Sequence, residues 1–381
     1  MIRSPRGTWE ASASLGRMAD GDGVEWIPDV LGDEFRQRTL PLADDDQGPV
    51  VATLVRALPA ERGWWERVRG RTPELDGVDV LYVHGWSDYF FQKRLARFWT
   101  SRGARFFALD LRKYGRSLRD GQTPGYVTDL ATYDEDIAAA LAVIGDEAEG
   151  GGAARRLVLL GHSTGGLTLS LWASRHPGVA DAVVLNSPWL EFQVAAARAA
   201  LAPVVELGAR LRPLDVAPQV DLGFYSRAQQ EVADPDDPVE IDLRWRPLQT
   251  MAVHAGWLNA ILTGHRTVSA GLAITAPVCV LLSARSATPT RWSDELTRAD
   301  SVLVVDDIAR AALRLGPSVT VERIDGALHD VFLSAHAARE EAYRRLDRWV
   351  TGWQAAVQPQ PEPALARRPL VDRLRSITRG A

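Results

Sequence analysis

Cysteine and lysine are almost missing from this chain of 381 residues. Cys279 is the one cysteine, which excludes an internal disulfide framework and any metal site built from several cysteines. Lys93 and Lys113 are the two lysines among 44 basic residues, a bias that we attribute to codon composition. A phosphate-binding P-loop needs a lysine directly after glycine, and neither lysine has one. A Schiff-base enzyme needs a suitably placed lysine, and this chain offers two candidates.

Long apolar runs are missing as well. No stretch of about 18 apolar residues exists, so the sequence predicts no membrane span. Residues 1–20 are polar and lack the apolar stretch of a secretory signal. The net charge of −5 gives no electrostatic reason to expect nucleic-acid binding, for which a basic face would be the signature. With 46% hydrophobic and 24% charged residues, we expect a cytoplasmic globular protein with a large core.

Short apolar runs alternate with helix-like stretches through much of the chain. The runs cover residues 78–83, 104–109, 157–160, 182–185, 277–282 and 319–324. The helix-like stretches cover residues 90–102, 129–144, 166–175 and 337–353. This alternation is typical of an α/β fold, in which helices cover both faces of a mostly parallel sheet. Ahead of it, residues 35–42 and 49–56 flank an acidic turn and predict a strand–turn–strand unit.

The alternation breaks between residues 190 and 270, which are rich in Ala and Arg and mostly helical. We interpret residues 190–270 as a helical cap inserted between strands of one sheet. The core then comprises residues 24–189 and 271–356, preceded by a flexible lead over residues 1–23. Residues 357–381 form a Pro-rich tail with five arginines. Such a tail could bind a membrane surface or a partner, although a solvated terminus is the simpler interpretation.

Gly161-His-Ser-Thr-Gly165 is the motif that carries chemistry, because it lies between an apolar run and a helix-like stretch. A sharp strand-to-helix turn strains the backbone of its central residue and leaves no space for neighbouring side chains. Glycine is therefore needed on both sides, and the hydroxyl of Ser163 is exposed as a nucleophile. The alternative is an ordinary glycine-rich turn.

Serine needs a base, and the base needs an acid to orient it. Within such a fold these follow in the order Ser, acid, His, which leaves His329 and His336 as bases. We favour His329, since it directly follows the run at 319–324, whereas His336 falls in the next helix. The aspartates in position to serve as the acid are Asp294, Asp300, Asp306 and Asp307. We favour Asp300, with Asp294 as the alternative, because Asp306 and Asp307 suit a helix start.

An acyl-transfer site also needs backbone N–H groups for the oxyanion. We expect one from Thr164, directly after the nucleophile, and one from Trp86 in the loop His84-Gly85-Trp86. Gly85 lets the backbone turn its N–H inward. His84 resembles a second base, but at a strand end it is expected to hold the loop by a hydrogen bond.

These motifs, with Asp110 to Ser117 and Gly326 to His329, resemble the α/β-hydrolase superfamily over residues 35–355. The most similar branch is monoacylglycerol lipase/lysophospholipase-like, also grouped as serine aminopeptidase S33-like. The resemblance implies Ser163 as nucleophile, His329 as base, Asp300 as acid, and oxyanion donors at Trp86 and Thr164. It implies no metal and no cofactor.

Two positions depart from the family pattern. The acid usually follows its strand in a short Gly-x-x-Asp turn, whereas residues 283–299 intervene before Asp300. A small or aliphatic residue usually stands where this chain has Trp86, so the pocket is expected to be narrower.

Aromatic residues of the predicted cap and of the loop after residue 83 could line an apolar substrate pocket beside His162. They are Tyr89, Trp189, Trp245 and Trp257, with Trp86, Phe90, Phe91, Phe192, Phe224 and Tyr225. We therefore predict a serine hydrolase for carboxylic esters, whose small-molecule substrates are like monoacylglycerols or lysophospholipids.

Three alternatives stay open. An aminopeptidase or amidase would use carboxylates such as Glu191, Asp221 or those at residues 234–237 to hold a substrate amine. An acyltransferase would exclude water beneath the cap. A non-catalytic ligand-binding homologue is the remote alternative.

Overall fold

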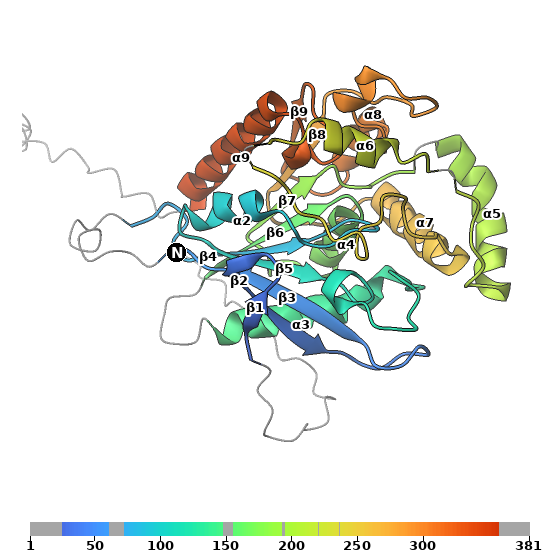
Figure 1. The fold of residues 1–381 in the computed structure, drawn as a ribbon, viewed down its shortest axis with the longest axis horizontal. Helices are drawn as coiled ribbons and strands as arrows, with labels where there is room; N and C mark the ends of the chain where they lie inside the picture. Colours follow the sequence, from blue (N-terminus) through green and yellow to red (C-terminus); the bar gives the residue numbers. More distant parts are fainter. Residues whose placement is uncertain are drawn as a thin grey trace, which may run out of the picture.

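The computed structural model describes residues 25–60, 72–147, 155–192, 195–219, 221–235 and 237–357. The predicted lead (1–23) lies outside these residues, as does the predicted tail after Val357. One sheet of nine strands organises the described chain, in the order β1-β2-β3-β5-β4-β6-β7-β8-β9 (Figure 1). None of the helices in these ranges combines the length and apolar character that a membrane crossing requires.

Six neighbouring strands of this sheet run parallel. They are β5 (Arg105–Asp110), β4 (Val78–Val83), β6 (Arg156–His162), β7 (Ala182–Asn186), β8 (Val278–Ser283) and β9 (Val319–Ile324). At the β5 edge the sheet continues antiparallel through β3 (Val51–Ala57), β2 (Gly32–Pro41) and β1 (Ile27–Asp29). The mostly parallel sheet expected from the alternating pattern is thus confirmed, with the strand–turn–strand unit forming its antiparallel side.

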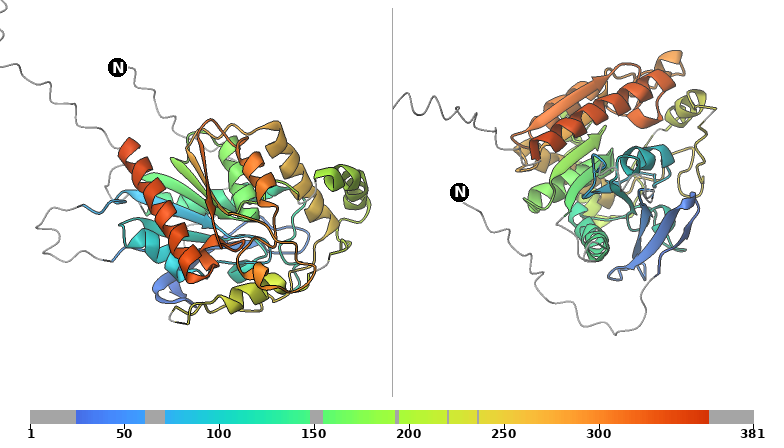
Figure 2. Two further views of the ribbon diagram at one scale, coloured as in Figure 1. Left: turned by 90° about the horizontal axis from the view of Figure 1, so that it is seen from above. Right: turned by 90° about the vertical axis from the view of Figure 1, so that its left-hand side faces the viewer.

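Helices cover both faces of the sheet because the central strands are apolar on both sides. In β4, Val80 and Tyr82 belong to one apolar core, and Leu81 and Val83 belong to the other. The first core is covered by α2 (Lys93–Thr100) and α9 (His336–Val357) (Figure 2). The second is covered by α3 (Tyr133–Asp146), α4 (Thr164–Arg175), α7 (Ala255–Ala270) and α8 (Val305–Ala312).

Between β7 and β8 the chain forms α5 (Ala195–Leu211), α6 (Phe224–Glu231) and α7. We call residues 190–270 the cap segment. Helix α5 packs against α7 at one end of the sheet (Figure 1). Helix α7 buries Trp257, Ile261 and Val268 in the same core as α4, so the C-terminal part of the cap segment also packs against the sheet.

The order of the strands changes direction at β4. Its neighbours β5 and β6 follow it in sequence but lie on opposite sides of it. In an open α/β sheet, ligands bind outside the carboxyl ends of the strands at such a point. The loop after β4 and the turn after β6 meet there.

Candidate active site

Ser163 links β6 to α4 in a sharp turn. Its backbone has φ 51° and ψ −115°, a conformation that residues with a Cβ rarely adopt. The strain is held by the packing of the strand and the helix, and it presents the hydroxyl at the carboxyl edge of the sheet. Ser163 is also the N-cap of α4, so it lies at the positive end of the helix dipole.

The glycines around Ser163 let α4 pack closely against β4 and β6. A Cβ on Gly165 would lie 2.3 Å from the carbonyl oxygen of His84 and 2.4 Å from that of Val83. A Cβ on Gly161 would lie 2.7 Å from the backbone of α4. The motif therefore has glycine at these positions because backbone atoms occupy the space that any side chain would need.

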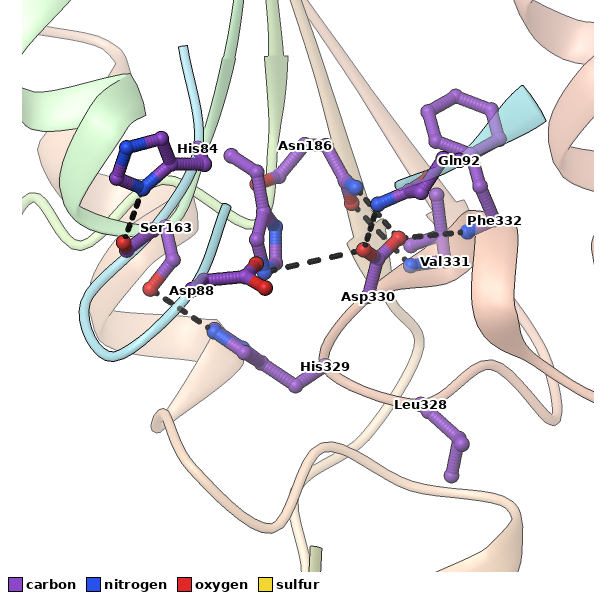
Figure 3. A network of polar contacts seen from close by, with 12 residues as sticks. His84, Asp88, Gln92, Ser163, Asn186, Leu328, His329, Asp330, Val331 and Phe332 are labelled. Carbon is purple, nitrogen blue, oxygen red and sulfur yellow. Dashed lines mark hydrogen bonds and ion pairs between the residues drawn. The ribbon is translucent and has the colours of Figure 1, made fainter. Parts of the chain in front are cut away.

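The structure brings Ser163, His329 and Asp300 into one chain of hydrogen bonds. His329 Nε2 lies 3.0 Å from Ser163 Oγ, as Figure 3 shows, and His329 Nδ1 lies 2.9 Å from Asp300 Oδ2. All three residues are buried. The other oxygen of Asp300 accepts the N–H groups of Val302 and Leu303, both at 2.8 Å. These two bonds hold the carboxylate so that Oδ2 faces the histidine.

Asp300 reaches the sheet although residues 284–299 separate it from β8. The chain returns to the strand end, where Asp300 pairs with Ser286 in a parallel bridge and its N–H donates to the Arg285 carbonyl at 3.0 Å. The alternative Asp294 is exposed, in a short 3₁₀ helix at Asp294–Thr297.

The remaining candidates from the sequence lie elsewhere. Asp306 and Asp307 belong to the first turn of α8, where they pair with Arg323 and Arg310. His336 is exposed at the first residue of α9.

His84 holds the loop after β4. Its Nε2 accepts the N–H of Leu111 at 3.1 Å, so the proton is on Nδ1, which donates to the Gly85 carbonyl at 2.7 Å. Burial lowers the pKa of His84 and keeps the ring neutral. Gly85 packs so closely against Ser163 that an added Cβ would lie 3.1 Å from Ser163 Cβ. Trp86 is the next residue in the chain, so its backbone also lies near Ser163.

A cavity of about 400 Å³ opens over Ser163 and His329. Of the residues expected in the pocket, Trp86, Trp189, Tyr225 and His162 line it. Leu222, Phe224, Leu248 and Val302, of which only Phe224 was among the expected aromatics, add to the apolar wall. Asp88 and Arg246 form a charged part of the same wall.

The structure places six of the expected pocket residues outside this cavity, namely Tyr89, Phe90, Phe91, Phe192, Trp245 and Trp257. Trp257 is buried behind its wall, with its ring 3.8 Å from that of Trp86 and 6.1 Å from that of Trp189. Tyr89 belongs to the other core, and Trp245 of the cap segment packs against it there, with ring centroids 5.2 Å apart. A count of aromatic residues cannot distinguish a side chain that faces a cavity from one that supports it from behind.

Asp330, directly after His329, is the centre of a buried network that the sequence reasoning missed (Figure 3). Its carboxylate accepts the amide groups of Gln92 and Asn186, both at 2.7 Å, and the N–H of Phe332 at 3.0 Å. His162 Nε2 lies 3.9 Å away, although burial lowers the pKa of this histidine. The position of Asp330 beside His329 was the only signal in the sequence that could have indicated it.

No group of three or more His, Cys, Asp or Glu residues within the described part of the chain could hold a metal ion.

A strained serine between a parallel strand and a helix, bonded to a histidine and an aspartate from later strand ends, defines an α/β hydrolase. The family model described as serine aminopeptidase, S33, matches residues 78–333, and the chain belongs to this family. None of the curated proteins matches it in sequence.

Solved structures with the same fold include three lipases and esterases. A monoacylglycerol lipase from Paleococcus ferrophilus has a TM-score of 0.55 at 19% identity, covering 79% of this chain and 98% of its own. A monoglyceride lipase from Saccharomyces cerevisiae, in complex with a substrate analogue, has a TM-score of 0.57 at 15% identity, covering 82% and 94%. A carboxyl esterase from Bacillus coagulans, in complex with glycerol, has a TM-score of 0.54 at 12% identity, covering 84% and 99%.

Proposed function

We propose that this protein is a serine hydrolase that cleaves carboxylic esters with apolar acyl or aryl groups. The hydrogen-bonded chain Ser163–His329–Asp300 beside a largely apolar cavity is the observation that carries the proposal. His329 takes the proton of Ser163 as the hydroxyl oxygen attacks the ester carbonyl, and passes it to the departing alcohol. Water then attacks the acyl-enzyme with His329 as base. Asp300 keeps Nδ1–H of the imidazole in place throughout.

The tetrahedral intermediate carries a negative oxygen that needs N–H donors. We assign this role to Thr164 and Trp86. Thr164 is the first residue of α4, and the N–H groups of a first helical turn have no partner within the helix. Trp86 is brought near by the contact of Gly85 with Ser163.

The carboxylates of the site favour an ester over a peptide with a free amine. Asp88 and Asp221 are the aspartates that line the cavity in the described chain. Asp88 pairs with Arg246, and Asp221 accepts the N–H groups of Gly223 and Thr250 at 2.8 Å and 2.6 Å. A substrate amine would therefore compete with partners that this chain already supplies to both carboxylates.

The other acidic candidates belong to different surroundings. Asp234 and Asp237 line a separate cavity of about 530 Å³ and pair with Arg339 and Arg94. Glu191 does not line the catalytic cavity. The lipases and esterases among the similar structures agree with ester hydrolysis, and monoacylglycerol-like or lysophospholipid-like esters are the substrates to test first. The cytoplasmic location and any role of the C-terminal tail stay predictions.

The test compares wild type with Ser163→Ala in fluorophosphonate labelling and in turnover of p-nitrophenyl esters of increasing acyl length. We expect both to be lost in Ser163→Ala. Asp300→Asn should reduce kcat by about 10³- to 10⁴-fold, since the neutral amide no longer holds the required imidazole tautomer. The matched control Asp294→Asn removes an exposed charge from the same excursion and should leave turnover unchanged.

Two results would contradict the proposal. Labelling of Ser163 without turnover of any ester would favour an amidase or an acyltransferase. No labelling of a folded protein would favour the non-catalytic homologue.

A further inference from the structure

The oxyanion loop, residues 84–89, is attached to the cap segment by three successive side chains. The three contacts are Ser87 Oγ accepting Met251 N–H at 3.1 Å, Asp88 pairing with Arg246 at 3.0 Å, and Tyr89 OH accepting Asp242 N–H at 2.8 Å. Ser87 has a positive φ of 54°, so the loop leaves the expected oxyanion donor through a strained residue. The three contacts with the cap segment therefore hold the loop at the point where its backbone is strained.

The middle contact is a buried ion pair. The side chains of Asp88 and Arg246 are 7% and 13% exposed, and within the described chain Arg246 is the one cation at ion-pair distance from Asp88. Burial raises the pKa of Asp88 to about 6, against the opposing effect of Arg246. Removing one partner of such a pair leaves the other charge buried without compensation. Asp88 lies alongside Ser163 and His329 in Figure 3, and both charged residues line the catalytic cavity.

Arg246 also leads to the loop that carries His329. Its Nη2 donates to Gln229 Oε1 at 2.7 Å, and Gln229 Nε2 donates to Tyr225 OH at 2.8 Å. The same phenolic oxygen accepts the N–H of Asp330 at 3.2 Å. The ring of Tyr225 lies 5.7 Å from that of His329. A continuous polar path thus runs from the oxyanion loop, through Arg246 in the cap segment, to the residue after the catalytic histidine.

We propose that Arg246 is a positioning residue that ties the cap segment to both catalytic loops, through Asp88 on one side and through Gln229 and Tyr225 on the other. The inference rests on the proposed ester hydrolysis at Ser163. Arg246 does not itself enter the reaction. It sets the distance between the oxyanion donors and the imidazole, and preorganised donors stabilise the transition state without rearranging during the reaction.

The test uses Arg246→Gln in the full chain, with Arg244→Gln as its matched control. Arg244 lies two residues away and pairs with Asp242, but its side chain is 80% exposed. With a neutral soluble ester such as p-nitrophenyl butyrate, we expect Arg246→Gln to lower kcat about 10- to 100-fold, since displacements of about 1 Å have effects of this size. KM should change little, and Arg244→Gln should match wild type. Arg246→Lys keeps the cation without the planar fork and should fall between them.

A second measurement keeps the proposal independent of turnover. Hydrogen exchange of the amides at residues 86–91 and 327–331 should accelerate in Arg246→Gln and not in Arg244→Gln. If Arg246→Gln does not fold, Arg246→Lys and Asp88→Asn carry both measurements.

Wild-type kcat in a folded Arg246→Gln would overturn the proposal, and so would a rise in KM alone, which would make Arg246 a substrate contact. Unchanged exchange in both loops would overturn the attachment itself. If wild type hydrolyses no ester while exchange responds as expected, the proposed function fails and the attachment stands.

Discussion

Gly165 offers the sharpest test of how Ser163 is held in place, because two backbone carbonyl oxygens lie close to the α-carbon of Gly165. In Gly165→Ala the new methyl group would lie 2.3 Å and 2.4 Å from the carbonyl oxygens of His84 and Val83. Real Cβ atoms do not approach other atoms closer than 3.0 Å, so α4 and the end of β4 must separate by about 0.7 Å or more. Backbone atoms cannot rotate away as a side chain can.

Two effects follow from this separation. Overpacking at a site that cannot relax destabilises a fold by about 1–3 kcal/mol, and a clash with two carbonyl groups belongs at the upper end. Ser163 directly precedes Thr164 at the start of α4, so the same movement changes its distance of 3.0 Å from His329. A misplacement of this size lowers kcat by about 100-fold.

Gly352→Ala is the matched control. Gly352 lies in α9 with nothing within 4 Å of an added Cβ, so the alanine should stabilise the protein by about 0.5–1 kcal/mol and leave kcat unchanged. Urea unfolding followed by tryptophan fluorescence measures the stability, and p-nitrophenyl butyrate hydrolysis measures kcat. Wild-type stability together with wild-type kcat in Gly165→Ala would refute the reasoning.

Two further predictions concern buried carboxylates. Asp330→Asn turns an acceptor of three N–H groups into a partial donor, so it should destabilise the protein by about 1–3 kcal/mol and lower kcat at least tenfold. Asp325→Asn changes an exposed aspartate of the same loop and should alter neither stability nor kcat. Equal effects of both variants would exclude a special role for Asp330. The pKa of Asp88, about 6 against an ordinary 3.8, means that the folded chain keeps a proton there that the unfolded chain releases, so stability falls as pH rises from about 4 to 6. Asp88→Asn removes that loss, and its stability relative to wild type should increase by about 2 kcal/mol between pH 4 and pH 7 in urea unfolding; a difference independent of pH would contradict it.

The parts of the fold that were predictable are those whose signal is local. The alternating apolar runs indicated the parallel sheet because β4 and its neighbours are buried on both faces, which requires continuous apolar sequence. The glycines at 161 and 165 indicated the turn at Ser163, because the same close backbone contacts recur wherever this turn forms. His329 followed from chain order.

Asp300 was harder to predict from sequence, and the reason is structural. Residues 284–299 separate it from β8 along the chain, yet the bonds between Asp300, Arg285 and Ala287 return it to the end of the strand. When a loop returns to the strand end from which it left, residues far from the strand in sequence lie close to it in space. The exposed Asp294 lies within that loop and not at its closing point.

The pocket was predicted least well, because its walls are built from contacts between distant segments. Trp257 and Trp189 are both tryptophans, but helix α7 turns Trp257 into the core, whereas Trp189, just after β7, lines the cavity. Arg246 shows the same limit for charge. In a chain with 44 basic residues nothing marks this arginine, and only the fold brings it to Asp88 and to the path toward His329. If that path positions the catalytic loops, part of the catalytic rate of this enzyme is determined by a residue of the cap that touches no reacting atom.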